Sequence, residues 1–210
     1  MLVSRVYEDI SDTYSRFEAF IGSFLDKIDI DIMPGTQDFS NAYMPQQPVN
    51  SFLFPELSSS ETLNLVTNPH KFTLANGVKC LGTSGQNLHD VHLYSKLNAE
   101  FASPAGQLRY LLEARHLCPT APDTLRCFPF REGDPFVMDR APDVLFAGCQ
   151  PSYCEETIFQ HKNSRESAVK ILSVPTFAKT RSIVLLDLET LQSYELKFGK
   201  PFNSGAGSAG

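Results

Sequence analysis

The sequence has no run of about 18 apolar residues, the length at which a segment becomes a candidate to span a bilayer as a helix. It also has no excess of basic residues, since 18 Lys and Arg stand against 24 Asp and Glu, for a net charge of −6 at pH 7. This balance argues against a domain that holds nucleic acid on its own basic surface. We therefore expect no membrane contact, and no contact with DNA except through other proteins.

Several motifs of catalysis and metal binding are also missing. The five cysteines form no CxxC pair, and the five histidines form no HExxH motif. There is no Gly-x-Ser-x-Gly nucleophile elbow, and no Gly-Lys-Ser/Thr follows the glycines at 82 and 85. An odd number of irregularly spaced cysteines is typical of free thiols in a reducing compartment. The sequence thus predicts no catalytic residue, no metal site and no cofactor.

What is present is an ordinary globular composition, with 42% hydrophobic and 20% charged residues. A chain of 210 residues can bury one sizeable core. We assign residues 1–198 to one domain. Residues 199–210 end in NSGAGSAG, which has no apolar content to order it, and we expect a flexible tail there.

The stretch from 28 to 41, IDIDIMPGTQDFSN, indicates where a site would lie. Alternation of Ile28, Ile30 and Ile32 with aspartates predicts a strand with one buried face. Pro34-Gly35 then predicts a sharp turn at the carboxyl end of that strand, where open α/β sheets place their sites. We expect Gly35 to adopt a backbone angle that a Cβ would disfavour.

The remaining pattern predicts helices alternating with strands, and hence an α/β (α+β) fold. Helices are expected over 7–28, 88–97 and 104–115, the second with Asn87 as its N-cap. A hairpin with an Asn76-Gly77 turn is expected over 71–81, followed by strands over 143–147, 168–174, 181–188 and 193–198. Glycines between the hairpin and the second helix could instead cradle a phosphate, although a tight turn is the simpler interpretation.

One pair of histidines and one histidine–cysteine pair could suggest a metal site. His89 and His92 lie on one helix face near Asp90, and His116 lies beside Cys118. We interpret the first pair as solvated surface and His116 as a structural histidine, because neither pair has a third ligand at metal spacing.

Two long segments, 41–57 and 120–140, are rich in proline and aromatic residues and are expected to be surface loops. Phe52, Leu53 and Phe54 in the first must bury either on this chain or on a partner.

Six blocks of sequence occur in an order and spacing that resemble one protein family: DIMPGTQDFSN, PQQP, LVTNPH, GTSGQNLHD, RHLCPTAPDTL and PDVLFAG. The region from 28 to 198 resembles the B, or second, subunit of eukaryotic replicative DNA polymerases, in its polymerase delta branch. The resemblance implies part of a calcineurin-like phosphoesterase two-sheet sandwich that has lost its hydrolytic metals. It also implies an OB-fold and the first half of the phosphoesterase domain before this region, so a chain truncated at its N-terminus is expected.

The resemblance further implies a degenerate site. The Gly-Asn-His-Asp loop of active relatives falls on Gly35, Thr36, Gln37 and Asp38, where Thr is a poor ligand and Gln cannot give up a proton near neutral pH. The late histidine-rich block falls on 142–151. The degenerate former-site positions are Gly35, Thr36, Gln37, Asp38, Phe146, Gly148, Cys149 and Pro151. Cys149 could bind a metal in principle, whereas Phe146 and Pro151 could not.

The function that the resemblance implies is that of a non-catalytic, nuclear scaffold protein. It would bind the C-terminal metal-binding module of the polymerase delta catalytic subunit and bridge to further accessory subunits. The candidate partner-interface residues are Met44, Pro45, Pro48, Phe52, Phe54, Phe128 and Phe130. Alternatives are a residual metal-dependent phosphodiesterase that uses Asp38, the second subunit of another replicative polymerase, and an interaction module unrelated to replication.

Overall fold

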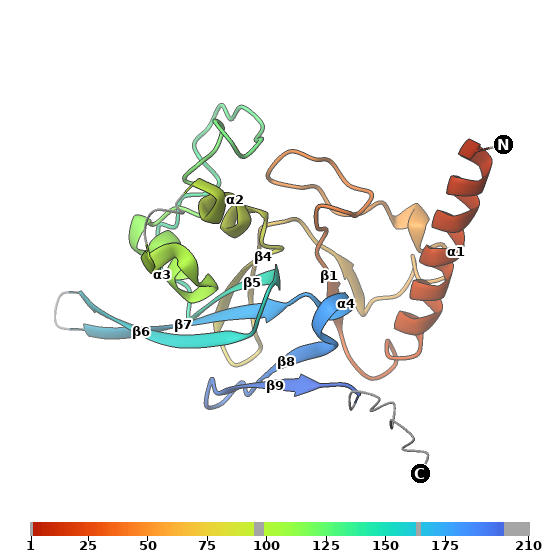
Figure 1. The fold of residues 1–210 in the computed structure, drawn as a ribbon. Helices are drawn as coiled ribbons and strands as arrows, with labels where there is room; N and C mark the ends of the chain where they lie inside the picture. Colours follow the sequence, from red (N-terminus) through yellow and green to blue (C-terminus); the bar gives the residue numbers. More distant parts are fainter. Residues whose placement is uncertain (1, 95–98, 163–164, 200–210) are drawn as a thin grey trace, which may run out of the picture.

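The computed structural model describes residues 2–94, 99–162 and 165–199 (Figure 1). Its elements are, in chain order, α1 (Leu2–Gly22), β1 (Ile30–Ile32), η1 (Ser51–Leu53), β2 (Leu63–Leu65), β3 (His70–Thr73), β4 (Lys79–Thr83), α2 (Gln86–Tyr94), η2 (Ala99–Ala102), α3 (Pro104–Ala114), β5 (Val144–Gln150), β6 (Cys154–Lys162), β7 (Arg165–Pro175), α4 (Phe177–Thr180), β8 (Ser182–Leu186) and β9 (Ser193–Lys197). The mixed α/β class expected from the sequence is confirmed.

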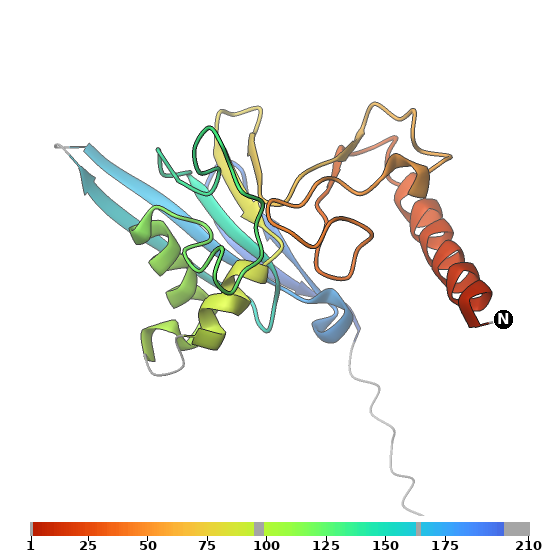
Figure 2. The same cartoon turned by 90° about the horizontal axis from the view of Figure 1, so that it is seen from above.

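A five-stranded sheet in the order β3-β4-β5-β7-β6 forms the larger part of the molecule. Its three central strands run parallel, and both edge strands pair antiparallel to their neighbours. Helices α2 and α3 lie in the crossover from β4 to β5 and cover one face, as Figures 1 and 2 show. Leu111 and Leu112 of α3 and Leu145 of β5 are fully buried in the core between these layers.

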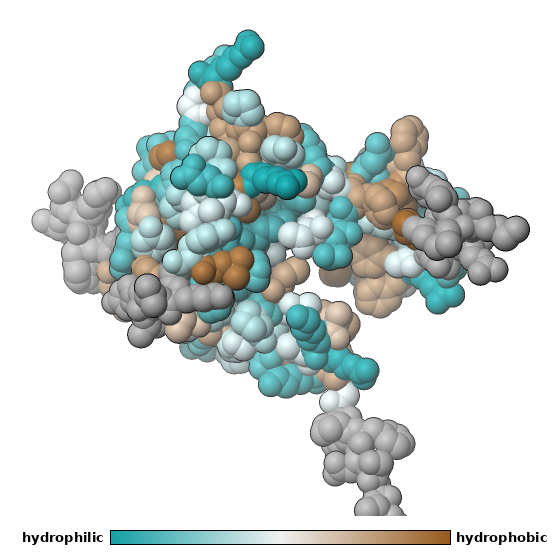
Figure 3. Space-filling view, turned by 45° about the horizontal axis from the view of Figure 1, so that its top comes forward, coloured by the Kyte–Doolittle hydropathy of each residue, from teal (hydrophilic) through white to brown (hydrophobic). Residues whose placement is uncertain are grey.

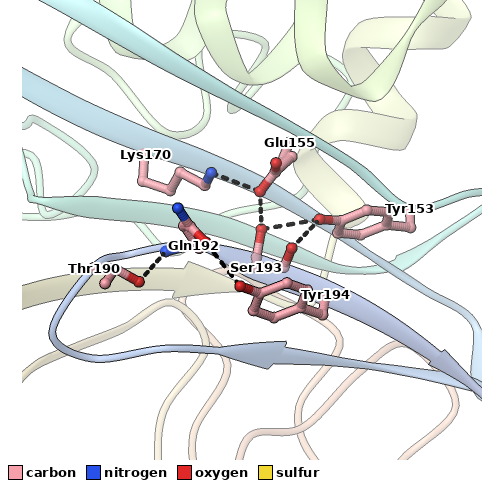
Figure 4. A network of polar contacts seen from close by, with 7 residues as sticks. All are labelled: Tyr153, Glu155, Lys170, Thr190, Gln192, Ser193 and Tyr194. Atoms are coloured by element: carbon pink, nitrogen blue, oxygen red, sulfur yellow. Dashed lines mark hydrogen bonds and ion pairs between the residues drawn. The ribbon is translucent and has the colours of Figure 1, made fainter.

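The opposite face of the sheet is covered by the β8–β9 hairpin. Leu186 and Leu191 pack against a small cluster that contains Val144 and Leu172. A polar network also joins the hairpin to β6 and β7 (Figure 4). In it, Lys170 Nζ lies 2.6 Å from Glu155 Oε2, the Ser193 hydroxyl donates to the same carboxylate, and the Tyr153 hydroxyl donates to Ser193 O at 3.1 Å. We call the five-stranded sheet with α2, α3 and this hairpin the sheet body.

The first third of the chain forms a second packing unit from α1, β1, η1 and β2, here called the N-terminal unit. Strands β1 and β2 pair in parallel, and their apolar residues pack with Ile21, Val49 and Phe54. The Glu18 carboxylate accepts backbone N–H groups of Glu56 and Leu57 at 2.8 and 3.1 Å, which fixes α1 to the loop after η1. In Figures 1 and 2, α1 stands apart from the five-stranded sheet.

The N-terminal unit leaves much apolar surface uncovered within the described chain. The exposed fractions are 43% for Phe17, 62% for Phe20 and 55% for Ile28. Figure 3 shows apolar side chains gathered beside α1, while hydrophilic colours dominate the sheet body. The two units therefore differ in how completely they close their own cores.

Most predicted elements are present, with shifted ends. The hairpin at β3–β4, the helix at α3 and the strands at β5, β7, β8 and β9 are confirmed. Helix α3 begins where it does because Ser103 Oγ accepts the Gly106 N–H at 3.1 Å and Pro104 occupies the first turn. The predicted tail falls almost wholly on residues 200–210, which lie outside the described residues.

Two predictions are wrong, and one strand was not predicted. The first helix ends at Gly22 and the strand begins at Ile30, so turns separate them where a continuous helix to residue 28 was expected. Asn87 is not an N-cap. It lies inside α2, fully buried, and its amide donates to Leu117 O at 2.7 Å. Strand β6 was not predicted, because its glutamates at 155 and 156 interrupt any apolar alternation.

Candidate functional site

A pocket of about 500 Å³ opens at the carboxyl ends of β1, β4 and β5. It brings together the loop after β1, the glycine-containing turn after β4 and the irregular end of β5, as expected for an α/β sheet. Its polar lining comes from Thr36, Asp38, Ser40, Asn41, Gln46, Ser84, Gln86, His89, Asp90, Thr124, Arg126 and Cys149. Three of the eight former-site positions, at 36, 38 and 149, therefore share one pocket with the glycine turn.

In the loop after β1, the carboxylate of Asp38 closes a turn. Asp38 Oδ2 accepts the Gly35 N–H at 2.7 Å, while Thr36 and Gln37 are exposed to solvent. The expected unusual backbone angle at Gly35 is wrong: its φ is ordinary, and a Cβ there would lie 3.4 Å from Asp38 Oδ2, in normal contact. Gln37 contributes to a different pocket, between this loop and α1.

The wall of the pocket is a network of neutral amides and hydroxyls. Asn68 is fully buried, with its side-chain NH₂ 2.8 Å from Gln46 Oε1 and 2.6 Å from Ser84 Oγ, and its Oδ1 accepts the Ser84 N–H at 3.1 Å. Gln86 Nε2 donates to Gln46 Oε1 at 2.7 Å, and Gln46 Nε2 donates to Gly35 O at 3.1 Å. Because these groups satisfy one another, the wall is stable without an ion. The sequence analysis missed Gln46 and Asn68, although both lie in the quoted PQQP and LVTNPH blocks.

The conformational constraint expected at Gly35 is found instead at Gly85. Its φ is +96°, and a Cβ there would overlap Gly148 O and the Gln150 side-chain amide. Gly148 therefore acts as a backbone neighbour of the glycine turn. Gly85 directly precedes α2, and its carbonyl oxygen accepts the His89 N–H at 3.0 Å as the first hydrogen bond of that helix, so Gly85 stands at the N-cap position that was expected for Asn87.

Of the candidate positions on and after β5, Cys149 alone is among the residues that line the pocket. Phe146 points to the opposite face of the sheet, where its ring covers Gly82 so closely that a Cβ at Gly82 would overlap it. Pro151 is exposed and does not line the pocket. Cys149 does line it, at a bulge where its φ is +54°. Partial desolvation raises the pKa of the Cys149 thiol and the nearby Asp38 carboxylate raises it further, so the thiol stays protonated at neutral pH.

His89 and His92 face different surroundings, whereas His116 stays in contact with Cys118. His89 lines the pocket, whereas His92 Nδ1 lies 3.3 Å from Gln107 Nε2. The structural interpretation of His116 is confirmed: Nε2 lies 2.8 Å from Asp134 Oδ2, and Nδ1 accepts the Cys118 N–H at 3.1 Å. Across the described residues, no group of three or more His, Cys, Asp or Glu is placed to hold a metal ion.

No helix in the same part of the chain is long and apolar enough to cross a membrane.

The two long loops, which the sequence analysis treated as separate candidate interfaces, are joined. The Met44 N–H donates to Arg126 O at 2.9 Å, the Phe128 N–H donates to Met44 O at 3.0 Å, and the Tyr43 and Phe128 rings are 5.3 Å apart. The structure thereby makes one surface of segments about 80 residues apart.

Not all the candidate interface residues are accessible on that surface. Met44 and Phe54 are 2% and 1% exposed and belong to this chain's own cores, and Pro45 and Pro48 are half-buried. Phe52 is 88% exposed, Phe128 41% and Phe130 40%. Three of the seven candidates are thus left exposed: Phe128 and Phe130 on the second loop, and Phe52 in η1 of the N-terminal unit.

Comparison with known proteins gives a consistent picture. The family of the B subunit of DNA polymerases alpha and epsilon matches residues 9–155. The DNA polymerase delta small subunit of Arabidopsis thaliana is 37% identical over 95% of this chain and 43% of its own length. The DNA polymerase delta subunit 2 of Drosophila melanogaster is 35% identical over 93% of this chain and 44% of its own length. The DNA polymerase delta small subunit of Saccharomyces cerevisiae is 35% identical over 90% of this chain and 43% of its own length. The chain thus spans less than half the length of these relatives.

Proposed function

Because the chain belongs to the family of the B subunit of DNA polymerases alpha and epsilon, we propose that it acts as a non-catalytic, nuclear accessory subunit of DNA polymerase delta. In this role it binds the catalytic subunit of the polymerase and links it to further accessory subunits, and it meets DNA only through the complex. The observation that carries the proposal is the 37% identity to a polymerase delta small subunit over 95% of the chain.

The geometry of the pocket supports a role without hydrolysis. A metal-dependent phosphoesterase needs ligands that hold its ions and a group that protonates the leaving oxygen. Here Asp38 closes its own turn, Asp90 Oδ2 accepts the Thr124 hydroxyl at 2.6 Å, and the pocket wall consists of paired amides. The acids that face the pocket are thus already used in holding loops together.

The surface of the joined loops supports a role in binding protein. Exposed aromatic side chains on loops that are hydrogen-bonded to each other lose little conformational entropy when a partner covers them. Phe52 and Phe128 are the best placed, since each is exposed while the adjacent backbone is fixed by η1 or by Met44. We place the contact with the catalytic subunit there.

The test is a pull-down in which the tagged chain captures a co-expressed catalytic subunit of polymerase delta. Capture should be stoichiometric for the natural chain and should fall about tenfold or more in Phe52→Asp and Phe128→Asp, because loss of an aromatic anchor costs about 2 kcal/mol. The matched control is Phe159→Asp, which changes an exposed phenylalanine on β6, away from the loops. Absence of capture with the natural chain would refute the proposal, and equal loss in all three variants would refute the location.

A further inference from the structure

The first strand of the sheet body leaves its outer edge open. Strand β3 is an edge strand that pairs only with β4. The Leu74 N–H donates to Val78 O at 2.9 Å at the end of this hairpin, and hydrogen-bonded pairs alternate along an antiparallel ladder. The backbone groups of Lys71 and Thr73 therefore point away from β4. From the described part of the chain, no segment other than β4 donates to or accepts from these two residues.

A groove of about 680 Å³ runs beside this edge. One side is the β3–β4 hairpin and the other is formed by residues 135–142, at the end of the second long loop and directly after it. Its lining includes Lys71, Thr73, Lys79, Val137 and Arg140. The groove also has an apolar part, since Val137 is 49% exposed and four prolines are among its lining residues. Because Lys71, Phe72 and Thr73 of β3 line the groove, a chain added along β3 would lie against it.

The groove is locally basic in a chain whose net charge is −6. Lys71, Lys79 and Arg140 are all exposed, and none of them forms an ion pair with a described residue. Two acids also lie next to the groove: Asp143, which accepts the Lys79 backbone N–H at 2.7 Å, and Asp139, which adjoins Arg140 in the sequence. Three unpaired cations beside an open strand edge are complementary to an acidic strand.

We propose that the edge of β3 accepts an extended acidic segment of a protein partner as a sixth strand, with its carboxylates against Lys71, Lys79 and Arg140. Unpaired edge groups recruit such strands through main-chain hydrogen bonds, and side chains at alternate positions give specificity. The inference deepens the proposed scaffold role and rests on it, because it names the chemistry of one further subunit's contact. A nucleic acid is disfavoured, since it would leave the strand edge unused.

The test uses the full chain and a fluorescein-labelled decapeptide of alternating Glu and Val, with alternating Lys and Val as the opposite-charge control. Fluorescence anisotropy should show binding of the acidic peptide at least about tenfold tighter than of the basic one. Lys71→Glu combined with Arg140→Glu should weaken binding about tenfold, since it turns two attractions into repulsions. Lys27→Glu, an exposed lysine outside the groove, should leave binding unchanged.

The strand edge is tested separately from the charge. Thr73→Pro removes the outward N–H at a position where an edge strand tolerates proline, and Thr73→Ala is its matched control. Proline should abolish binding and alanine should preserve it. If the proline variant fails to fold by circular dichroism, N-methylation of alternate peptide amides removes the complementary bonds, from the peptide N–H groups to the outward carbonyls of Lys71 and Thr73, and should also abolish binding to the natural chain.

Equal affinity for the acidic and the basic peptide would overturn the inference. So would an affinity for the acidic peptide that changes neither with Thr73→Pro nor with N-methylation. Tighter binding of a DNA duplex, lost on charge reversal but kept in Thr73→Pro, would overturn it in favour of nucleic acid. Capture of the catalytic subunit is measured in parallel on the same variants. Peptide binding without capture contradicts the proposed function alone, and capture without peptide binding contradicts this inference alone.

Discussion

The sheet body and the N-terminal unit have similarly apolar elements but close their cores to different extents. In the sheet body, both faces of the central strands are covered, by α2 and α3 on one side and by the β8–β9 hairpin on the other. In the N-terminal unit, Tyr14 and Ile21 face a small core while Phe20 and Ile28 remain exposed. Amphipathic periodicity therefore shows which residues can form a core, but not whether the chain itself supplies the covering layer.

The largest expected contrast is in truncation of apolar side chains. Leu111→Ala, in the sheet body, should lower the free energy of unfolding by about 2–5 kcal/mol, because the side chain is fully buried and leaves a cavity. Phe20→Ala, in the N-terminal unit, should change it by less than about 0.5 kcal/mol, because that ring is 62% exposed. Urea unfolding measures both. Equal effects would show that the two units are closed to the same degree in solution.

The sequence could predict the features that depend on residues close together in the chain, but not those that depend on distant segments. Local signals predicted the β3–β4 hairpin from Asn76-Gly77 and helix α3 from its apolar spacing. The alternation of Leu145 and Phe146 could also have placed Phe146 on the face away from the helices. Its position over Gly82 depends on strand pairing between segments 64 residues apart, which no local pattern contains.

The candidate site was predicted in its location but not in its wall. A turn after β1 and a glycine turn after β4 are recognisable from residues, and parallel strands bring their carboxyl ends together. Gln46 and Asn68 were missed because polar side chains in loops usually face solvent. Nothing in a single sequence indicates which side-chain amide is buried instead. The same limit applies to β6, an edge strand whose two glutamates are neutralised by Lys170 and Arg109 from other elements.

Two glycines, one in each unit, give a contrast of intermediate size. Gly85→Ala should destabilise the sheet body by about 1–3 kcal/mol, because φ is +96° and the new Cβ meets Gly148 O. Gly35→Ala, in the loop after β1, should be nearly neutral, because its φ is ordinary and the nearest atom to a Cβ is 3.4 Å away. Thermal unfolding of both variants checks this, and a larger loss at Gly35 would contradict the assigned turn geometry.

The smallest contrast concerns ion pairs. The hydrogen bond from Lys170, with a further bond from Ser193, lowers the pKa of Glu155 below its usual value. A depressed carboxyl pKa contributes stability above the unfolded value of about 4.5 and loses it as pH falls through the folded value. Glu155→Gln should thus lower Tm at neutral pH, and the difference from the natural chain should vanish in acid. The carboxylate is more than a third exposed, so the effect should stay below about 1 kcal/mol.

The exposed Asp12–Arg16 pair of α1 provides the matched control in the N-terminal unit. Asp12→Asn should leave Tm nearly unchanged at every pH, because pairs so open to solvent contribute little. A Tm difference for Glu155→Gln that is constant from neutral to acid pH would show that the network in Figure 4 acts through packing alone.

The central claim is that the pocket at the carboxyl ends of β1, β4 and β5 holds loops together and does not hydrolyse phosphodiesters. The direct measurement is hydrolysis of bis-p-nitrophenyl phosphate by the purified chain, with and without manganese, beside an Asp38→Ala variant. We expect no turnover above buffer in any of these samples, because the two acids that line the pocket, Asp38 and Asp90, are already hydrogen-bonded to the Gly35 N–H and to the Thr124 hydroxyl. Manganese-stimulated turnover by the natural chain that disappears in Asp38→Ala would contradict it.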